Sequence, residues 1–76
     1  MDKTYWIEIH GVLDVIEGES SYRTKSFPSL EEAQLYWRAN KANELAHFVE
    51  LHPSTKEITD ISIYQQTVTR VYPLLD

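Results

Sequence analysis

Three histidines are the side chains with the widest chemical range in this 76-residue chain, which contains no cysteine. Only His47 and His52 are close in sequence, and a spacing of five residues on a helix does not place two rings on one side. Glu44 and His47 are three residues apart, which favours a surface ion pair over half of a metal site. A serine, His10 and Asp60 could form a nucleophile, a base and an orienting acid, but nothing activates one particular serine. We therefore expect no enzyme activity, no metal and no cofactor.

The composition and the length of the chain disfavour nucleic acid and membranes as partners. Twelve acidic residues against seven basic residues give a net charge of −5, and phosphate binding normally needs a positive field, so nucleic acid is disfavoured as a partner. A chain this short builds one core and has little room for a deep cleft, which predicts a single domain over residues 1–76. The absence of cysteine fits a reducing cytoplasm, and neither a signal peptide nor a membrane-spanning run is evident. We expect a cytoplasmic protein without a membrane partner.

Three segments have strand patterns. Residues 5–16 alternate between apolar odd and more polar even positions, which predicts a half-buried strand with its odd face inward. A polar turn containing Gly18 leads to a second strand at 21–27, whose charges are typical of a sheet edge. In 58–72 the alternation slips near Gln65, and because Gln-Gln is poor chemistry for a two-residue hairpin, we interpret the segment as one long bent strand.

One helix is predicted between the second and third strands. Ser29 and Glu32 have the spacing of a capping box, and Pro53 predicts that the helix ends near Leu51. The resulting β-β-α-β order predicts a two-layer α+β sandwich. In it, a three-stranded antiparallel sheet of strand order 2-1-3 carries one long helix on one face.

The predicted helix has two apolar stripes on opposite sides, although only one side can face a single sheet. The alanine stripe contains Leu35, Ala39, Ala42, Ala46 and Val49, with Leu45 beside it, and the aromatic stripe contains Leu30, Ala33, Trp37, Phe48 and Leu51. Three interpretations remain open. The helix is kinked within 38–43 and both halves turn inward; or the alanine stripe packs on the sheet and leaves Trp37 and Phe48 partly exposed; or the aromatic stripe is an interface anchored by Trp37.

The sheet face without the helix should present a second set of residues. They are Trp6, Glu8 and His10 from the first strand, Asp60, Ser62 and Tyr64 from the third, and Tyr22 from the second. Aromatic residues on an open sheet can stack nucleic-acid bases, but Glu8 and Asp60 would repel phosphates. Cross-strand aromatic pairing that stabilises the sheet and burial against a partner are the two other interpretations.

These observations favour a small acidic, non-catalytic protein-binding module that acts as an inhibitor or adaptor of a larger complex. Its size and acidity are also those of phage and mobile-element proteins that block host defence complexes. Acidic side chains around the hairpin turn would steer it to a partner with a basic surface. The predicted contact residues are Trp37, Phe48, Trp6, Tyr64, His10, Glu8, Asp14, Glu17 and Glu19. The alternatives are a structural homodimer with the aromatic stripe as its interface, and a small enzyme or nucleic-acid binder.

Overall fold

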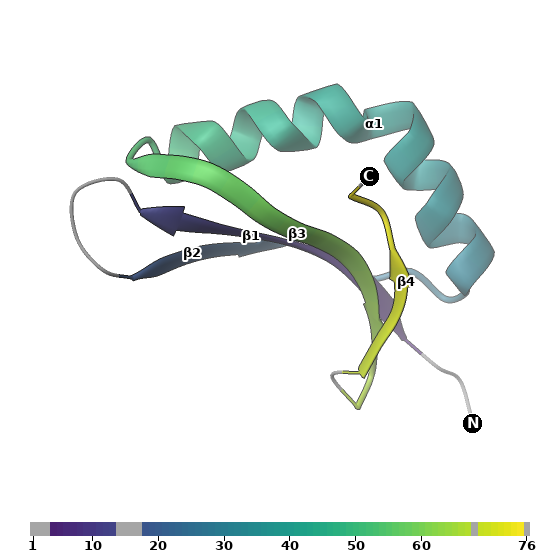
Figure 1. Cartoon of the computed structure of the whole chain (residues 1–76). Coiled ribbons are helices and arrows are strands. Elements are labelled where there is room, and N and C mark those ends of the chain that lie inside the picture. Colours follow the sequence, from purple (N-terminus) through teal and green to yellow (C-terminus); the bar gives the residue numbers. More distant parts are fainter. Residues whose placement is uncertain (1–3, 14–17, 68, 76) are drawn as a thin grey trace.

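The computed structural model describes residues 4–13, 18–67 and 69–75. The elements in this part of the chain are β1 (Tyr5–Leu13), β2 (Glu19–Arg23), α1 (Leu30–Leu51), β3 (Thr55–Gln65) and β4 (Thr69–Pro73). The strands pair antiparallel in one sheet of order β2-β1-β3-β4, and α1 covers one face of it (Figure 1). The predicted α+β class with a helix layer on a sheet layer is confirmed.

The sheet has four strands in the described residues, so the prediction of three was wrong. The segment interpreted as one bent strand reverses direction after Gln65, and Gln65 pairs with Thr69 across the new hairpin. A chain reversal changes the alternation of side chains in the same way as a bulge does. The connection at 66–68 is also longer than the two-residue turn for which Gln-Gln is unsuited.

The register between β1 and β3 determines which side chains face the helix. Ile7 is opposite Ile63, and Ile9 is opposite Ile61, and all four side chains are buried under α1. The predicted inward odd face of the first strand is confirmed. The core cluster consists of Ile7, Ile9, Phe27, Ala33, Trp37, Phe48, Ile61 and Ile63.

Helix α1 begins and ends where the sequence predicts. The Ser29 hydroxyl accepts a hydrogen bond from the Glu32 backbone N–H at 3.1 Å, and the His52 N–H donates to the Phe48 carbonyl at 2.9 Å. Figure 1 shows that α1 bends near its middle and follows the curved sheet. The Asn40 side chain donates to the carbonyl of Tyr36 at 3.0 Å, and a side chain that enters the backbone hydrogen-bond ladder is a common cause of helix bending. The helix is therefore bent within the predicted 38–43 region, but it continues as one element without a second cap.

The aromatic stripe of α1 faces the sheet. Trp37 is 5% exposed and Phe48 is 0% exposed, so the two predicted helix anchors are core residues, and the interpretations that exposed them were wrong. The alanine stripe points outward instead, with Leu35 53% and Val49 55% exposed. The physical reason is area: burial of an indole and a phenyl ring removes far more apolar surface from water than burial of alanine methyl groups.

Candidate functional site

The sheet face opposite α1 carries the residues that its alternation predicted. Trp6 pairs with Tyr64, Glu8 with Ser62 and His10 with Asp60 across β1 and β3. Tyr22 does not join them, because it is opposite Ile9 and therefore lies on the helix side. Its strand had weakly marked faces, and only the pairing register decides its direction.

Trp6 is covered by its own neighbours on this outer face. Its ring stacks on Tyr64, with centroids 6.5 Å apart and planes 10° from parallel, and the Arg23 guanidinium lies 4.3 Å from the ring centroid. The indole N–H donates to Glu8 at 2.7 Å. Trp6 is only 5% exposed as a result, so it offers little surface as an anchor for a partner. The arrangement matches the interpretation of cross-strand aromatic pairing.

Glu8 is the acceptor at the centre of this outer face. Besides the indole, His10 Nε2 lies 2.8 Å from Oε1 and Arg23 Nη2 lies 3.5 Å from Oε2. Burial alone would raise the pKa of Glu8, but the hydrogen bonds from Trp6 and His10, with the charges of His10 and Arg23, lower it below its usual value. The carboxylate is therefore held in its charged form as a structural acceptor.

The other predicted chemical groups are not arranged for nucleophilic catalysis. The Ser62 hydroxyl donates to Asp60, 3.1 Å from each carboxylate oxygen, whereas the histidine of the same face bonds to Glu8. The serine therefore bonds to a carboxylate and not to a histidine, and the order nucleophile, histidine base, orienting acid is absent from this face. No group of three or more His, Cys, Asp or Glu side chains in the described residues could hold a metal ion.

The predicted surface pair between Glu44 and His47 does not form. His47 is near Glu50 instead, with 3.8 Å between Nδ1 and Oε1. His52 lies at the end of α1, where its Nε2–H donates to the Ser21 carbonyl at 2.9 Å. The three histidines thus have separate partners, and His47 and His52 both lie beside β2, near Tyr22 and Ser21.

A buried carboxylate is the main polar feature that sequence reasoning missed. Glu44 is 8% exposed on the inward side of α1, where it accepts hydrogen bonds from the hydroxyls of Tyr22, at 2.9 Å, and Tyr36. The hydrogen bond to Glu44 is the largest cause, and burial the second, of the rise in the pKa of Tyr36 to about 12. The pKa of Tyr22 is also raised, first by burial and then by its hydrogen bond to Glu44. The sequence signal for the burial of Glu44 was its position on the aromatic stripe, seven residues after Trp37 and four before Phe48.

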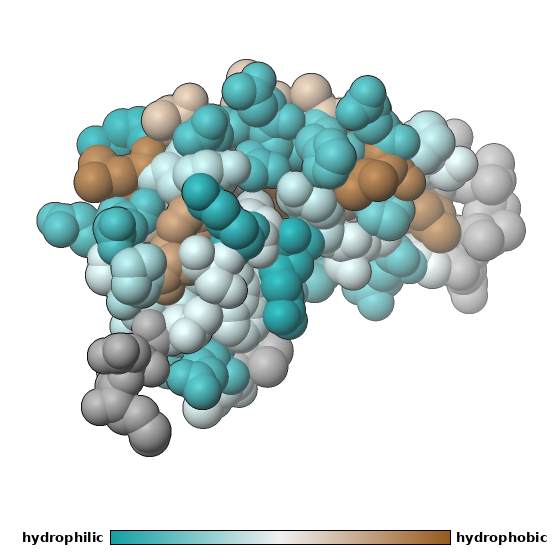
Figure 2. All heavy atoms as spheres, turned by 180° about the vertical axis from the view of Figure 1, so that it is seen from behind, coloured by the Kyte–Doolittle hydropathy of each residue, from teal (hydrophilic) through white to brown (hydrophobic). Residues whose placement is uncertain are grey.

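The outward face of α1 carries a line of apolar residues, which we call the outer seam. It consists of Leu35, Ala39, Ala42, Ala46 and Val49, all of them exposed. The members are separated by four, three, four and three residues, which is the spacing of a helix seam that contacts another helix. Figure 2, the view from behind, shows pale brown atoms along the helix edge with hydrophilic atoms between them.

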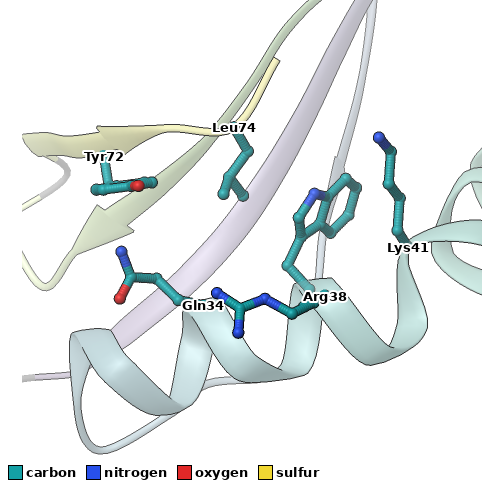
Figure 3. Close-up of a pocket in the computed structure, with 6 residues that line it drawn as sticks. Gln34, Arg38, Lys41, Tyr72 and Leu74 are labelled. Atoms are coloured by element: carbon teal, nitrogen blue, oxygen red, sulfur yellow. The ribbon is translucent and has the colours of Figure 1, made fainter. Parts of the chain in front are cut away.

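A groove of about 350 Å³ lies between α1 and the end of the sheet, and we call it the α1–β4 groove. In Figure 3 the side chains of Gln34, Arg38 and Lys41 extend from the helix, and Tyr72 and Leu74 lie across from them. The indole of Trp37 completes the lining. The groove thus combines two cationic groups with an apolar floor.

The acidic turn of the first hairpin is only partly described. Glu19 is exposed at the start of β2, and Asp14 and Glu17 lie outside the described residues. Electrostatic steering by this turn stays a prediction.

No protein-family model, characterised protein or solved structure matches the chain. No helix in the described part of the chain is long and apolar enough to cross a membrane.

Proposed function

We propose that this protein is a non-catalytic binding module that docks another protein along the outer seam of α1. The observation that carries the proposal is the exposure of this seam. The core uses the aromatic stripe, so the second apolar stripe has no role in packing against the sheet. Leu35 and Val49 are each more than half exposed at its two ends. Exposed apolar side chains at this spacing are typical of helices that dock into a groove of another protein.

The side chains of the outer seam suit contact with a helix or a flat apolar surface. The three central residues are alanines, and small side chains allow another backbone to approach closely. At 1.5 Å per residue, the distance from Leu35 to Val49 along the helix is about 21 Å. The exposed carboxylates of Glu31, Glu32 and Glu50 lie near the two ends of the seam, which favours a partner with basic side chains around its contact surface. Occupation of such a surface on a larger complex would make the protein an inhibitor or an adaptor.

A homodimer through the same seam is the second candidate, because the order of its residues is nearly self-complementary. An antiparallel pair of copies would place Leu35 opposite Val49 and Ala39 opposite Ala46. The bend of α1 makes its outward side convex, however, so two copies would touch over a short length near Ala42 (Figure 1). Stable complexes bury about 800 Å² per partner. A different protein with a concave surface can follow more of the seam, and we therefore rank it first.

The test measures binding with the seam altered. A tagged chain carrying a photo-crosslinking residue at Ala42 is used in its native host cells to identify the partner, and the affinity is then measured with both proteins purified. Ala42→Glu places a charge in the contact and should weaken binding by about tenfold or more. Gln66→Glu adds the same charge at the exposed turn before β4 and should leave the affinity unchanged.

Two results decide between the candidates. Equal affinities of Ala42→Glu and the unaltered chain for the partner would contradict docking on this seam. Sedimentation of the protein alone tests the second candidate: a dimer that Ala42→Glu dissociates supports it, and a monomer at micromolar concentration excludes it.

A further inference from the structure

We infer that the α1–β4 groove binds an acidic peptide segment, with one carboxylate at Arg38, a second carboxylate at Lys41 and an apolar side chain against Leu74. The inference rests on the proposed function, because the segment would belong to the docked partner. It specifies the chemical groups by which that partner would contact α1 at a second place, beside the outer seam.

Two cations of the groove are available to a ligand. Among the described residues, Arg23 and Arg70 each lie within 3.5 Å of a carboxylate oxygen, and Lys25 lies over two aromatic rings. Arg38 and Lys41 form no ion pair with any described carboxylate, yet they line the same groove. Although the net charge of the chain is −5, these two cations make the groove locally suited to anionic groups.

The donors of α1 are spaced along the groove. Gln34, Arg38 and Lys41 are separated by four and three residues and all line it; in Figure 3 the Arg38 guanidinium extends toward Gln34, whereas the Lys41 ammonium points away from it. The guanidinium can bind one carboxylate with two parallel hydrogen bonds, and the ammonium can bind a second one. The Gln34 carboxamide and the Tyr72 hydroxyl supply neutral donors at the rim.

The lining of the groove favours a peptide as the class of ligand. Leu74 and the buried Trp37 make part of the groove apolar, whereas Arg38, Lys41 and Tyr72 are exposed and leave it open to water. An open groove of about 350 Å³ cannot enclose a small molecule as ligand pockets usually do. A nucleic acid is disfavoured because its many phosphates would meet the negative field of the whole protein. A peptide that carries a carboxylate on each side of one apolar side chain can contact both cations and the apolar part of the groove.

The groove is also within reach of a partner on the outer seam. Arg38 directly precedes Ala39 and lies one turn after Leu35, and both of these residues belong to the seam. A protein that lies along α1 can therefore extend a segment past Arg38 toward β4.

The two tryptophans permit a direct titration by NMR. Trp37 lines the groove, and Trp6 lies on the opposite face of the sheet, so their indole N–H signals provide a reporter and an internal control. The probe is the blocked peptide Gly-Glu-Leu-Glu-Gly. We expect a saturable shift of the Trp37 signal and none of the Trp6 signal. Gly-Gln-Leu-Gln-Gly, which lacks the charges, and Gly-Glu-Ser-Glu-Gly, which lacks the apolar side chain, should each bind about fivefold more weakly.

Variants of the exposed cations locate the site. Arg38→Gln and Lys41→Gln should each weaken the peptide by about threefold to tenfold, whereas Lys56→Gln, at an exposed position on β3, should not. Unchanged binding to the double variant Arg38→Gln/Lys41→Gln overturns the inference. So does equal binding of the uncharged peptide, or inorganic phosphate that shifts the Trp37 signal at the same concentration as the peptide.

The two proposals fail in different ways. Ala42→Glu should weaken partner binding by about tenfold or more and leave the peptide titration intact. A partner that binds independently of the seam, with peptide binding preserved, contradicts the docking proposal alone. Partner binding that depends on the seam, without a shift of the Trp37 signal by the peptide, contradicts the groove inference alone.

Discussion

The buried carboxylate Glu44 makes a quantitative prediction about Tyr36. Replacement of Tyr36 by Phe keeps the ring against Phe27 and removes only the hydroxyl that donates to Glu44. A hydrogen bond to a charged group contributes about 1.5–3 kcal/mol, so we expect a loss of about 2 kcal/mol in the free energy of unfolding. At about 0.05–0.15 kcal/mol per residue, a domain of 76 residues has about 4–11 kcal/mol in total. The single hydroxyl therefore accounts for a large share of the stability.

Removal of both hydroxyls should cost more. In Tyr22→Phe/Tyr36→Phe the Glu44 carboxylate, 8% exposed, loses both of its donors. A buried charge without a partner destabilises a protein by about 3–5 kcal/mol, which would leave this double variant only marginally folded.

Urea unfolding followed by circular dichroism at neutral pH measures both changes. With a slope of about 1 kcal/mol per molar urea for a small domain, Tyr36→Phe should lower the midpoint by about 2 M. Tyr72→Phe is the matched control, because its hydroxyl is exposed on β4, and its effect should stay within about 0.5 kcal/mol.

A double-mutant cycle shows whether the effect passes through the carboxylate. In a Glu44→Leu background the Tyr36 hydroxyl has lost its acceptor, so Tyr36→Phe should be nearly neutral there. If Tyr36→Phe costs no more than Tyr72→Phe in the unaltered chain, or costs the same in both backgrounds, the reasoning about this cluster is refuted.

Three further predictions address the core, the close approach at Gly11 and pH. Trp37→Ala should lower the free energy of unfolding by about 3–5 kcal/mol, measured by urea unfolding, because it empties part of the core. An unchanged urea midpoint would contradict the burial of Trp37 and favour its role as an exposed interface anchor. Gly11→Ala should cost about 1–3 kcal/mol in thermal unfolding, because an added Cβ would lie 2.7 Å from the Glu57 carbonyl oxygen and 2.7 Å from the Thr55 methyl group. The pKa of Tyr36 is raised from 10.0 to about 12, so its protonated hydroxyl contributes stability that is fully present below pH 10 and is lost as the pH rises toward 12. As the pH rises across this range, the urea midpoint should fall more steeply for the unaltered chain than for Tyr36→Phe. Equal slopes against pH would contradict the contribution of the Tyr36 hydroxyl.

The alternation in residues 5–16 and the capping pair Ser29 and Glu32 were sufficient to predict a strand, a helix and the two faces of the sheet. Those signals are local, because side-chain direction and helix capping depend on neighbours within a few residues. The choice between two apolar stripes is not local. Periodicity shows that both sides of α1 are apolar, but the volume to be filled above the sheet selects the side with Trp37 and Phe48.

Two other features depended on contacts that local patterns do not contain. The slip of alternation at Gln65 is the same for a bulge and for a reversal, so β4 was missed. Glu44 interrupts an apolar stripe, and its compensation comes from Tyr36 two turns earlier and from Tyr22 on another element. Trp37 and Phe48 are therefore buried where the sequence left their exposure open, although the stripe that is exposed had been recognised.

The edges of the sheet limit how this protein can associate. β2 and β4 are the outermost strands and have five residues each. Exposed Glu19, Arg23 and Arg70 place charges along them, and Pro73 has no N–H with which to bond to another chain. Short, charged edges are poor templates for added strands, so concentrated solutions should resist growth into cross-β fibrils. For the same reason, recruitment of a peptide by β-augmentation is disfavoured at either edge.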